Sequence, residues 1–373
     1  MKLALFFTYA VSLEQWEKMG ILSREIKIYQ MLAEKIDQVY FFTYGSKNDL
    51  PFESRVGEKI TILPNKWKIP HFLYGFLMPF FYRQHLKNID IFRTHQMAGT
   101  VPAVIAKLLF KKKLIVRCGY EWLNFLEKQK KPLWKKTLVF AWEKIAYQAA
   151  DIVIFTSQKD KLFAQEKFHI PERKIRLIGN YIDTEIFQPL NVPKIKNSII
   201  YVGRLSKEKN LFSLLEAMEG LGLRLTMVGQ GPLQKPLEIF AREKKVWAEF
   251  KGLMPNERLP QKLNQYEIFI LPSLHEGCPK ALLEAMACGL ACVACDVPGV
   301  QEVITHLENG YLCDTDSFSL RQALQVVSQN KELREKMGKN ARETILRYFS
   351  LGNIMQKEYD ILEDVNKNIA SCS

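Results

Sequence analysis

Two glutamates flank the start of a predicted helix in the stretch HEGCPKALLEAMACG, which covers residues 275–289. Pro279 suits the first helical position, where its missing N–H costs nothing. Glu276 therefore precedes the helix, and Glu284 lies about 7.5 Å along its axis at about 1.5 Å per residue. A helix N-terminus is a favourable site for phosphate, and a carboxylate at that distance could reach sugar hydroxyls attached to the same phosphate. The alternative is that both glutamates are ordinary solvated helix charges.

Two further loops follow predicted strands and could hold the same ligand. The stretch YVGRLSKEKN places an arginine fork and a compact lysine charge in one short loop, a combination that suits a diphosphate. The stretch VGQGP ends the next strand with two glycines, which let a chain pass close to a ligand. Either loop could instead be a plain turn with solvated charges. The residues that we expect at the ligand are Gly203, Arg204, Lys209, Gly229 and Gly231.

Strand-like and helix-like segments alternate in both halves of the chain and could bring these loops together. The segment FQPLNVPKIKNS, with two prolines and no apolar period, indicates a linker between the halves. Such alternation predicts parallel sheets with crossover helices, which bind ligands at the carboxyl ends of their strands. We therefore expect an α/β protein of two doubly wound domains, at residues 1–186 and 187–352. Four loops of the second domain would face one crevice: the Arg204 loop, Gly229–Pro232, Pro272–Pro279 and Val297–Glu302.

The composition is that of an ordinary globular protein, with 25% charged and 47% hydrophobic residues in 373. No apolar run is long enough to span a bilayer, and no signal-peptide pattern follows the first strand-like run. The net charge is +13, of which residues 51–150 contribute +12. Because the basic region is confined, we expect an anionic surface as its partner. Nucleic acid is not expected, since the sequence contains no recognisable module for it.

The seven cysteines lie mostly in apolar runs, which is typical of small buried thiols in a reducing cytoplasm. Cys288, Cys292 and Cys295 also have the C-x3-C-x2-C spacing of radical-SAM iron–sulfur ligands. Their segment ACVACD resembles a buried strand, however, in which side chains alternate between the two faces. We therefore expect a cytoplasmic protein without a metal site.

Two stretches in the basic region have the composition of a membrane-surface segment. IPHFLYGFLMPFFY, at residues 69–82, is rich in aromatics, lies between lysines and arginines, and is too short to span a bilayer. Aromatic rings between cations suit a membrane interface. EKQKKPLWKKTLVFAWEK adds a basic amphipathic segment that contains Lys130, Lys131, Lys135 and Lys136. The alternative is an apolar hairpin that packs on the first domain.

The motifs of the second half resemble those of the family 4 retaining glycosyltransferases of the GT-B fold. The resemblance covers YVGRLSKEKN, VGQGPL, FKGLMP, LPSLHEGCPKALLEAMACG, DVPGVQEVI and NGYL, and extends weakly into IRLIGNYIDTEIFQP. A glutamate pair with seven residues between is the family's hallmark. The resemblance implies two Rossmann-like domains that face a central cleft, with the last helix, at residues 353–373, packed back on the first domain.

The same resemblance implies transfer of a sugar from a nucleoside-diphosphate sugar to a glycan or lipid-linked acceptor, with retention and without a metal or other cofactor. In the family, the counterparts of Arg204 and Lys209 bind the diphosphate and that of Glu284 binds the ribose. The counterpart of Glu276 lies near the donor sugar and is thought to stabilise positive charge at the anomeric carbon, which makes it the catalytic residue. Donor contacts are also implied for Gly277, Cys278, Pro279, Lys280, Ala281 and Leu282.

Lys280 breaks a local rule, because a cation in the first turn of a helix opposes the helix dipole. A bound anion would offset that cost, whereas the alternative is a lysine that extends into solvent.

The first half departs from the family pattern, so its acceptor-side residues are less well defined. The first-strand loop contains only Gly20 in place of a Gly-Gly pair, and Cys118 precedes Gly119 where many members have His-Gly. His95 and Arg117, each at a predicted strand end, are our other acceptor-side candidates, against the alternative of structural polar residues. We expect a peripheral protein on the inner face of the cell membrane. Two other functions fit the motifs: a nucleotide-sugar epimerase of the same fold, and a catalytically silent, membrane-associated nucleotide-sugar-binding protein.

Overall fold

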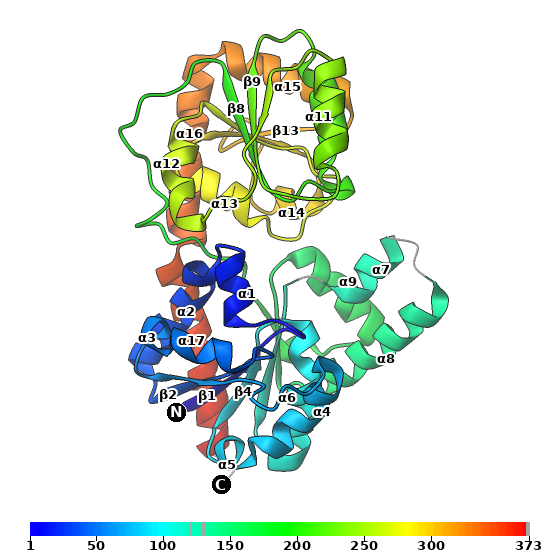
Figure 1. Ribbon diagram of the computed structural model, residues 1–373, viewed down its shortest axis with the longest axis vertical. Coiled ribbons are helices and arrows are strands. Elements are labelled where there is room, and N and C mark those ends of the chain that lie inside the picture. Colours follow the sequence, from blue (N-terminus) through cyan, green and yellow to red (C-terminus); the bar gives the residue numbers. More distant parts are fainter. Residues whose placement is uncertain (120, 129–131, 371–373) are drawn as a thin grey trace. The chain divides into compact units, whose positions relative to one another are not determined.

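The computed structural model describes residues 1–119, 121–128 and 132–370. Lys130 and Lys131 lie outside the described residues, and so do residues 371–373 of the predicted C-terminal helix. The chain forms two compact units (Figure 1). The first contains Met1–Gly179 and the residues from Met355 onward, and the second contains Asn180–Ile354.

The first unit contains a seven-stranded parallel sheet of order β3-β2-β1-β4-β5-β6-β7. β1 is apolar and buried along most of its length, as expected for a parallel strand covered on both faces. The strand order reverses between β1 and β4, where such sheets bind ligands. The strands are β1 Lys2–Phe6, β2 Gln38–Phe42, β3 Ile60–Leu63, β4 Ile91–Thr94, β5 Lys113–Cys118, β6 Ile152–Phe155 and β7 Ile175–Leu177.

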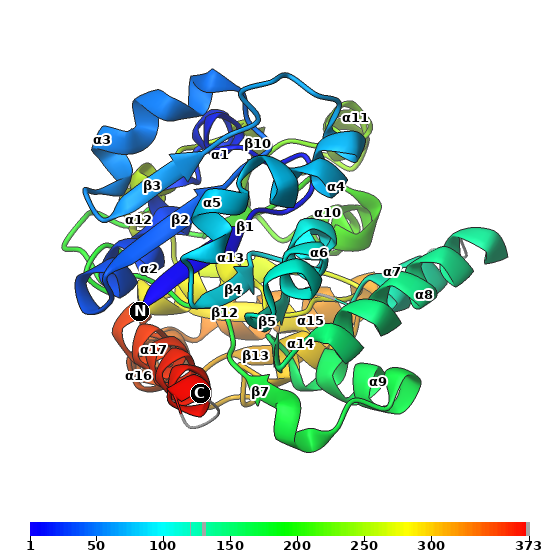
Figure 2. The same cartoon turned by 90° about the horizontal axis from the view of Figure 1, so that it is seen from below.

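Helices cover both faces of this sheet (Figure 2). α4, α5, α6, α8 and α9 bury side chains in one core against Phe6 and Phe92. On the other face, Trp16 of α1 stacks on Phe7 and Tyr29 of α2 packs on Phe41. The helices are α1 Leu13–Lys18, α2 Leu22–Lys35, α3 Glu53–Val56, α4 His71–Phe81, α5 Arg83–Lys87, α6 Thr100–Phe110, α7 Trp122–Lys128, α8 Leu133–Ala149, α9 Gln158–Phe168 and α17 Leu351–Ala370, which begins in the second unit.

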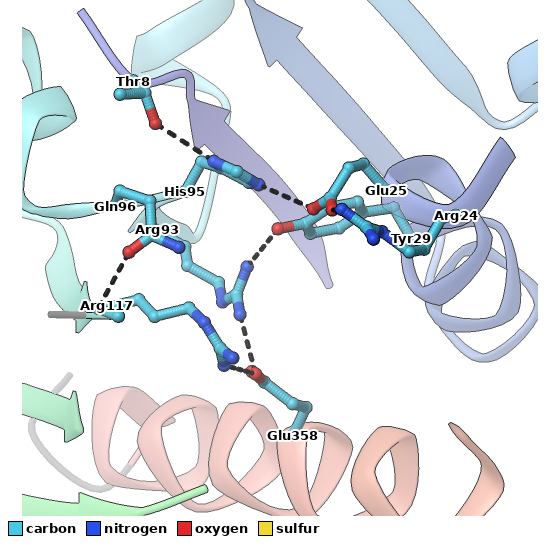
Figure 3. Close-up of polar contacts among 10 residues, drawn as sticks. Thr8, Arg24, Glu25, Tyr29, Arg93, His95, Gln96, Arg117 and Glu358 are labelled. Carbon is cyan, nitrogen blue, oxygen red and sulfur yellow. Dashed lines mark hydrogen bonds and ion pairs between the residues drawn. The ribbon is translucent and has the colours of Figure 1, made fainter. Parts of the chain in front are cut away.

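A buried ion cluster fastens α17 to the first unit (Figure 3). The guanidinium groups of Arg93 in β4 and Arg117 in β5 both donate to Glu358 Oε1 of α17, at 2.7 and 2.8 Å. Arg93 also donates to the Tyr29 hydroxyl at 2.7 Å, and all four side chains are buried. Burial acts to lower the pKa of Arg93, but Glu358 and Tyr29 outweigh it and raise that pKa. Two buried cations therefore share one carboxylate.

The second unit contains a six-stranded parallel sheet of order β10-β9-β8-β11-β12-β13. On its two faces, α10 packs with α11 and α15, and α13 packs with α16. The strands are β8 Ser198–Val202, β9 Arg224–Val228, β10 Ala248–Phe250, β11 Ile268–Leu271, β12 Ala291–Cys295 and β13 Tyr311–Cys313. The helices are α10 Leu211–Met218, α11 Gln234–Glu243, α12 Leu259–Asn264, α13 Lys280–Ala287, α14 Pro298–Gln301, α15 Ser317–Gln329 and α16 Lys331–Tyr348.

The segment that joins the units lies with the second unit from Asn180 onward, whereas we placed the boundary after residue 186. Ile182 N–H donates to Phe349 O, and Leu351 N–H donates to Ile182 O, each at 2.8 Å. Phe187 is buried in the core of the second unit. These contacts hold residues 180–186 against the end of α16.

Replacing Glu358 with alanine should destabilise the first unit by about 3–5 kcal/mol, the usual cost of leaving a buried charge without its partner. Urea unfolding and hydrogen exchange of the α17 amides would measure the loss. Glu363→Ala is the matched control, because Glu363 lies on the same helix and pairs with Lys367 at the surface, where we expect little change. Equal losses in the two variants would show that the cluster does not hold α17.

Candidate active site

The strand order of the second sheet reverses between β8 and β11, and the loops after these strands carry three of the predicted site residues. Arg204 and Lys209 follow β8, and Glu276 follows β11. The Lys209 ammonium lies 2.5 Å from Glu276 Oε1. The exposed fractions are 19% for the Lys209 side chain and 10% for that of Glu276. The structure thus pairs Lys209, which we predicted to bind the diphosphate, with Glu276, the predicted catalytic residue.

Close backbone contacts at glycines join each of these loops to its neighbour. Gly229 has a φ of +137°, which side chains rarely allow, and a β-carbon there would lie 1.9 Å from the Gly203 carbonyl oxygen. A β-carbon at Gly299 would lie 2.0 Å from the Gly277 carbonyl oxygen. Larger residues at Gly229 or Gly299 would push the loops apart. Gly231 lies in similarly close contact with the next carbonyl along the Arg204 loop.

A backbone hydrogen bond joins the two loops across the reversal point. Leu274 N–H donates to Glu208 O at 2.9 Å, and the Ser206 hydroxyl donates to Glu208 Oε1 at 2.6 Å. Partial burial acts to raise the pKa of Glu208, but the Ser206 hydrogen bond and the charges of Lys209 and Arg204 lower it. The backbone on both sides of the Lys209–Glu276 pair is therefore held in place.

The Arg204 guanidinium is exposed, while its backbone is anchored. The buried Tyr201 hydroxyl donates to Arg204 O at 2.8 Å, and Gly203 leaves room for that hydroxyl. Burial raises the pKa of Tyr201, and the negative charges of Glu276 and Glu208 add to the rise. A neutral phenol thus holds the loop from which the arginine fork extends.

Glu284 lies on α13 and is buried, with 2% of its surface exposed. Asn256, in the turn after β10, donates its side-chain N–H to Glu284 Oε1 at 2.9 Å. Pro279 caps α13 rather than forming its first turn, and Gly289 ends it with a φ of +71°. We did not predict Asn256, although a polar residue directly after the FKGLMP motif was a signal for it.

The residues before α13 contact the segment at 180–181. Asn180 Nδ2 donates to the Cys278 carbonyl at 2.6 Å, and the Lys280 ammonium lies 5.5 Å from the centre of the Tyr181 ring, within the range of a cation–π contact. Leu282 N–H donates to Pro279 O at 3.1 Å, and its side chain is buried in the core, while the neighbouring Ala281 is half-buried. The donor contacts expected for these residues stay predictions.

The three cysteines that share the iron–sulfur spacing lie at the end of α13 and in β12. Cys292 and Cys295 lie in the fully buried β12, as the sequence predicts, and Cys288 precedes it. Burial raises the pKa of Cys288 to about 12 and that of Cys292 further above its ordinary value, so neither thiol readily forms the thiolate that binds metals. Among the described residues, no group of three or more His, Cys, Asp or Glu side chains is arranged to hold a metal ion.

Two of the acceptor-side candidates, His95 and Arg117, make different contacts in the first unit (Figure 3). His95 follows β4 at the reversal point, where its Nδ1 lies 3.1 Å from the Thr8 hydroxyl and its Nε2 lies 3.5 Å from Glu25. Arg117 is directed to Glu358, and Gly20 ends the turn after α1 with a φ of +67°. The contacts described therefore place His95 at the reversal point and Arg117 in the buried ion cluster.

Comparison with known proteins assigns the family. Residues 182–344 match the family model described as "Glycosyl transferases group 1", and residues 27–186 match the one described as "Glycosyltransferase Family 4". The chain belongs to glycosyltransferase family 4.

Two curated relatives are similar to this family 4 chain over different lengths. An α-1,3-galactosyltransferase of Escherichia coli, named for UDP-Gal and α-D-GlcNAc-diphosphoundecaprenol, is 28% identical over 305 residues, covering 76% of this chain and 77% of that protein. N-acetyl-α-D-glucosaminyl L-malate synthase of Bacillus anthracis is 26% identical over 213 residues, covering 52% and 56%. The chain thus spans between about half and three quarters of these relatives.

Solved structures confirm the predicted GT-B fold. HepE of Anabaena, solved with UDP, has a TM-score of 0.78 at 16% identity and covers 98% of this chain and 100% of its own. Sucrose-phosphate synthase of Thermosynechococcus elongatus has a TM-score of 0.79 at 19% identity and covers 100% of both chains. At these identities the likeness shows the fold alone.

Asn256→Ala should destabilise the second unit by about 1.5–3 kcal/mol, because the buried Glu284 carboxylate loses a hydrogen bond to a charged group. Glu284→Gln in the same background should recover part of the loss, since a neutral amide is less costly to bury. Asn256→Asp should be worse than alanine, because it brings a second carboxylate to Glu284. Urea unfolding would measure all four proteins, and unchanged stability in Asn256→Ala would show that the bond contributes nothing.

Proposed function

We propose that this protein is a retaining, hexosyltransferase-type enzyme that moves a sugar from a nucleoside-diphosphate sugar to a glycan or lipid-linked acceptor. The observation that carries the proposal is the Lys209–Glu276 contact at the reversal point of the second sheet, with Glu284 on the adjoining helix. The proposed role is in the synthesis of a cell-surface polysaccharide or glycolipid.

Each site residue takes one part of the donor in this proposal. Arg204 and Lys209 bind the diphosphate and supply the positive charge that a leaving diphosphate needs, so we propose that no metal is required. Glu276 faces the sugar and stabilises the positive charge that develops at the anomeric carbon as its bond to the diphosphate breaks. Glu284 accepts hydrogen bonds from the ribose hydroxyls. We infer retention from the resemblance of the glutamate pair.

The relatives support this class of donor and acceptor. HepE was solved with UDP and with UDP-glucose. The name of the E. coli relative specifies UDP-Gal as donor and a sugar on diphosphoundecaprenol as acceptor. We propose the coarser class for this chain: a nucleoside-diphosphate sugar and a glycan or lipid-linked acceptor.

We propose that the acceptor binds at the reversal point of the first sheet. Thr8 follows β1, His95 follows β4, and their side chains meet at 3.1 Å at the carboxyl ends of these strands. Glu25 lies beside the other imidazole nitrogen. In this proposal His95 contacts the acceptor hydroxyl, whereas Arg117 would act on the acceptor only through the strand that it helps to hold.

The first unit exposes an apolar surface that suits a membrane. On α4, six large apolar side chains are exposed beside that of His71, while Tyr74, Gly75, Met78 and Pro79 face the core. α6 packs beside α4 and α8 beside α6. α6 carries exposed leucines, and α8 carries exposed leucines and lysines. Among the described residues, no helix is both long and apolar enough to cross a bilayer. The outer residues of α4 are Phe72, Leu73, Phe76, Leu77, Phe80 and Phe81.

We propose that this surface attaches the enzyme to the inner face of the cell membrane. Its apolar side chains would enter the interface and its lysines would contact anionic headgroups. A lipid-linked acceptor would be reached from the same membrane.

A nucleotide screen followed by a transfer assay tests the proposed function. A ligand that binds the native state raises the melting temperature, so the screen would compare nucleoside diphosphates with their sugar conjugates. An epimerase would convert the selected donor without acceptor, and a silent binder would be stabilised by the donor but turn over none of it. Transfer that requires an acceptor supports the proposal.

The two glutamates should separate in steady-state kinetics. Glu276→Ala should lower kcat by about 10²–10³-fold, the usual loss for one stabiliser of transition-state charge. Glu284→Ala should instead raise the donor KM by about tenfold to a hundredfold, because the ribose contact is lost in ground and transition states alike. The opposite pattern would mean that the roles are exchanged.

Vesicle binding should depend on both the apolar and the basic side chains. Lys135→Glu with Lys136→Glu should weaken binding to anionic vesicles at about 1 kcal/mol per surface cation. Phe72→Ser with Phe76→Ser should weaken binding further at high salt, where headgroup attraction is screened. Lys336→Glu with Lys339→Glu, on exposed positions of α16, is the matched control. A wild type that does not bind anionic vesicles at low salt would contradict the membrane proposal.

A further inference from the structure

Lys209 has two anionic partners, the Glu276 carboxylate and the proposed donor diphosphate. In the structure its ammonium contacts the Glu276 carboxylate at 2.5 Å, and in the proposed function it binds the donor diphosphate. We infer that Glu276 and the diphosphate compete for Lys209, so that this pair discriminates a nucleotide-sugar from a bare nucleoside diphosphate. This inference rests on the proposed function and adds to it a means of releasing the product.

The competition follows from a fixed backbone in the two loops and a flexible Lys209 side chain. The loops that carry the pair are joined by the Leu274–Glu208 backbone hydrogen bond, and the Glu276 loop is packed against Gly299 without room for a β-carbon. The backbone therefore cannot easily separate the two groups. The lysine side chain has four flexible carbons and one compact charge, so the exchange takes place by rotation of Lys209.

The two ligands differ in what they leave for Glu276. With a nucleotide-sugar, Lys209 turns to the diphosphate and Glu276 faces the sugar, whose hydroxyls can donate hydrogen bonds to the carboxylate. With a nucleoside diphosphate no sugar is present, and two anions lie close together with one ammonium between them. Because like charges repel strongly where water is largely excluded, Lys209 returns to Glu276 and the product is released.

Calorimetry with UDP and GDP as probes tests the inference. If Glu276 competes for Lys209, then Glu276→Gln should bind the preferred nucleoside diphosphate about fivefold to tenfold more tightly than wild type. Loss of an ordinary ligand contact would have the opposite sign. The nucleotide-sugar selected by the melting screen should gain no affinity from the same substitution, because Glu276 then has the sugar to face.

Two further variants separate exchange from a general field effect. Glu208→Gln removes a carboxylate from the same loop but leaves the Lys209–Glu276 pair intact, so its gain should be clearly smaller. Lys209→Met should abolish the gain, so that Lys209→Met with Glu276→Gln binds no better than Lys209→Met alone.

Four outcomes would overturn the inference: equal or weaker binding by Glu276→Gln, an equal gain in the nucleotide-sugar, an equal gain in Glu208→Gln, or a gain that persists without Lys209. If wild type binds neither nucleoside diphosphates nor their sugar conjugates, the proposed function itself is overturned, and the inference with it.

Discussion

Both sheets are organised by one constraint, the reversal in the order in which their parallel strands are added. At such a point the two flanking loops leave toward opposite faces, so the strand ends stay open to a ligand. The described side chains use both points: Thr8 meets His95 between β1 and β4, and Lys209 meets Glu276 between β8 and β11. The Leu274–Glu208 hydrogen bond and the Glu358 cluster hold the strands and loops around these points.

Two charge clusters with similar chemistry have different uses because they differ in burial. Arg93 and Arg117 share Glu358 where the exposed fraction of the Glu358 side chain is 2%, so neither water nor ligand can replace that carboxylate. Lys209 and Glu276 remain partly exposed, so an anion from solution can reach the lysine. Removing a partner from the first cluster is a matter of stability. In the Lys209–Glu276 pair, we propose that the lysine exchanges the carboxylate for a bound phosphate.

Local patterns in the sequence predicted the elements better than their partners. The alternation of apolar runs and the glycine loops predicted parallel sheets, and the EGCPKALLEAM stretch predicted the helix that carries Glu284. Asn256 and Glu284 are 28 residues apart, and Arg93 and Glu358 are 265 apart, so no local period could pair them. The signal available was chemical: an arginine inside the apolar strand IFRT requires a buried partner. Composition also identified the aromatic stretch of α4 but not which side faces outward, because that depends on what packs beneath it.

The two cations of the Arg204 loop, Arg204 and Lys209, are not interchangeable, and their difference supports the proposed division of roles. Arg204 is exposed, and its anchored backbone presents a planar fork that can bind two phosphate oxygens at once. An arginine at position 209 would bind Glu276 through the same rigid fork and would release it less readily. A lysine presents a single strongly hydrated charge on a flexible chain. This suits a group that, in our proposal, moves from Glu276 to the diphosphate on binding and back again on release. The residue types in this loop therefore match a fixed diphosphate clamp beside an exchangeable one.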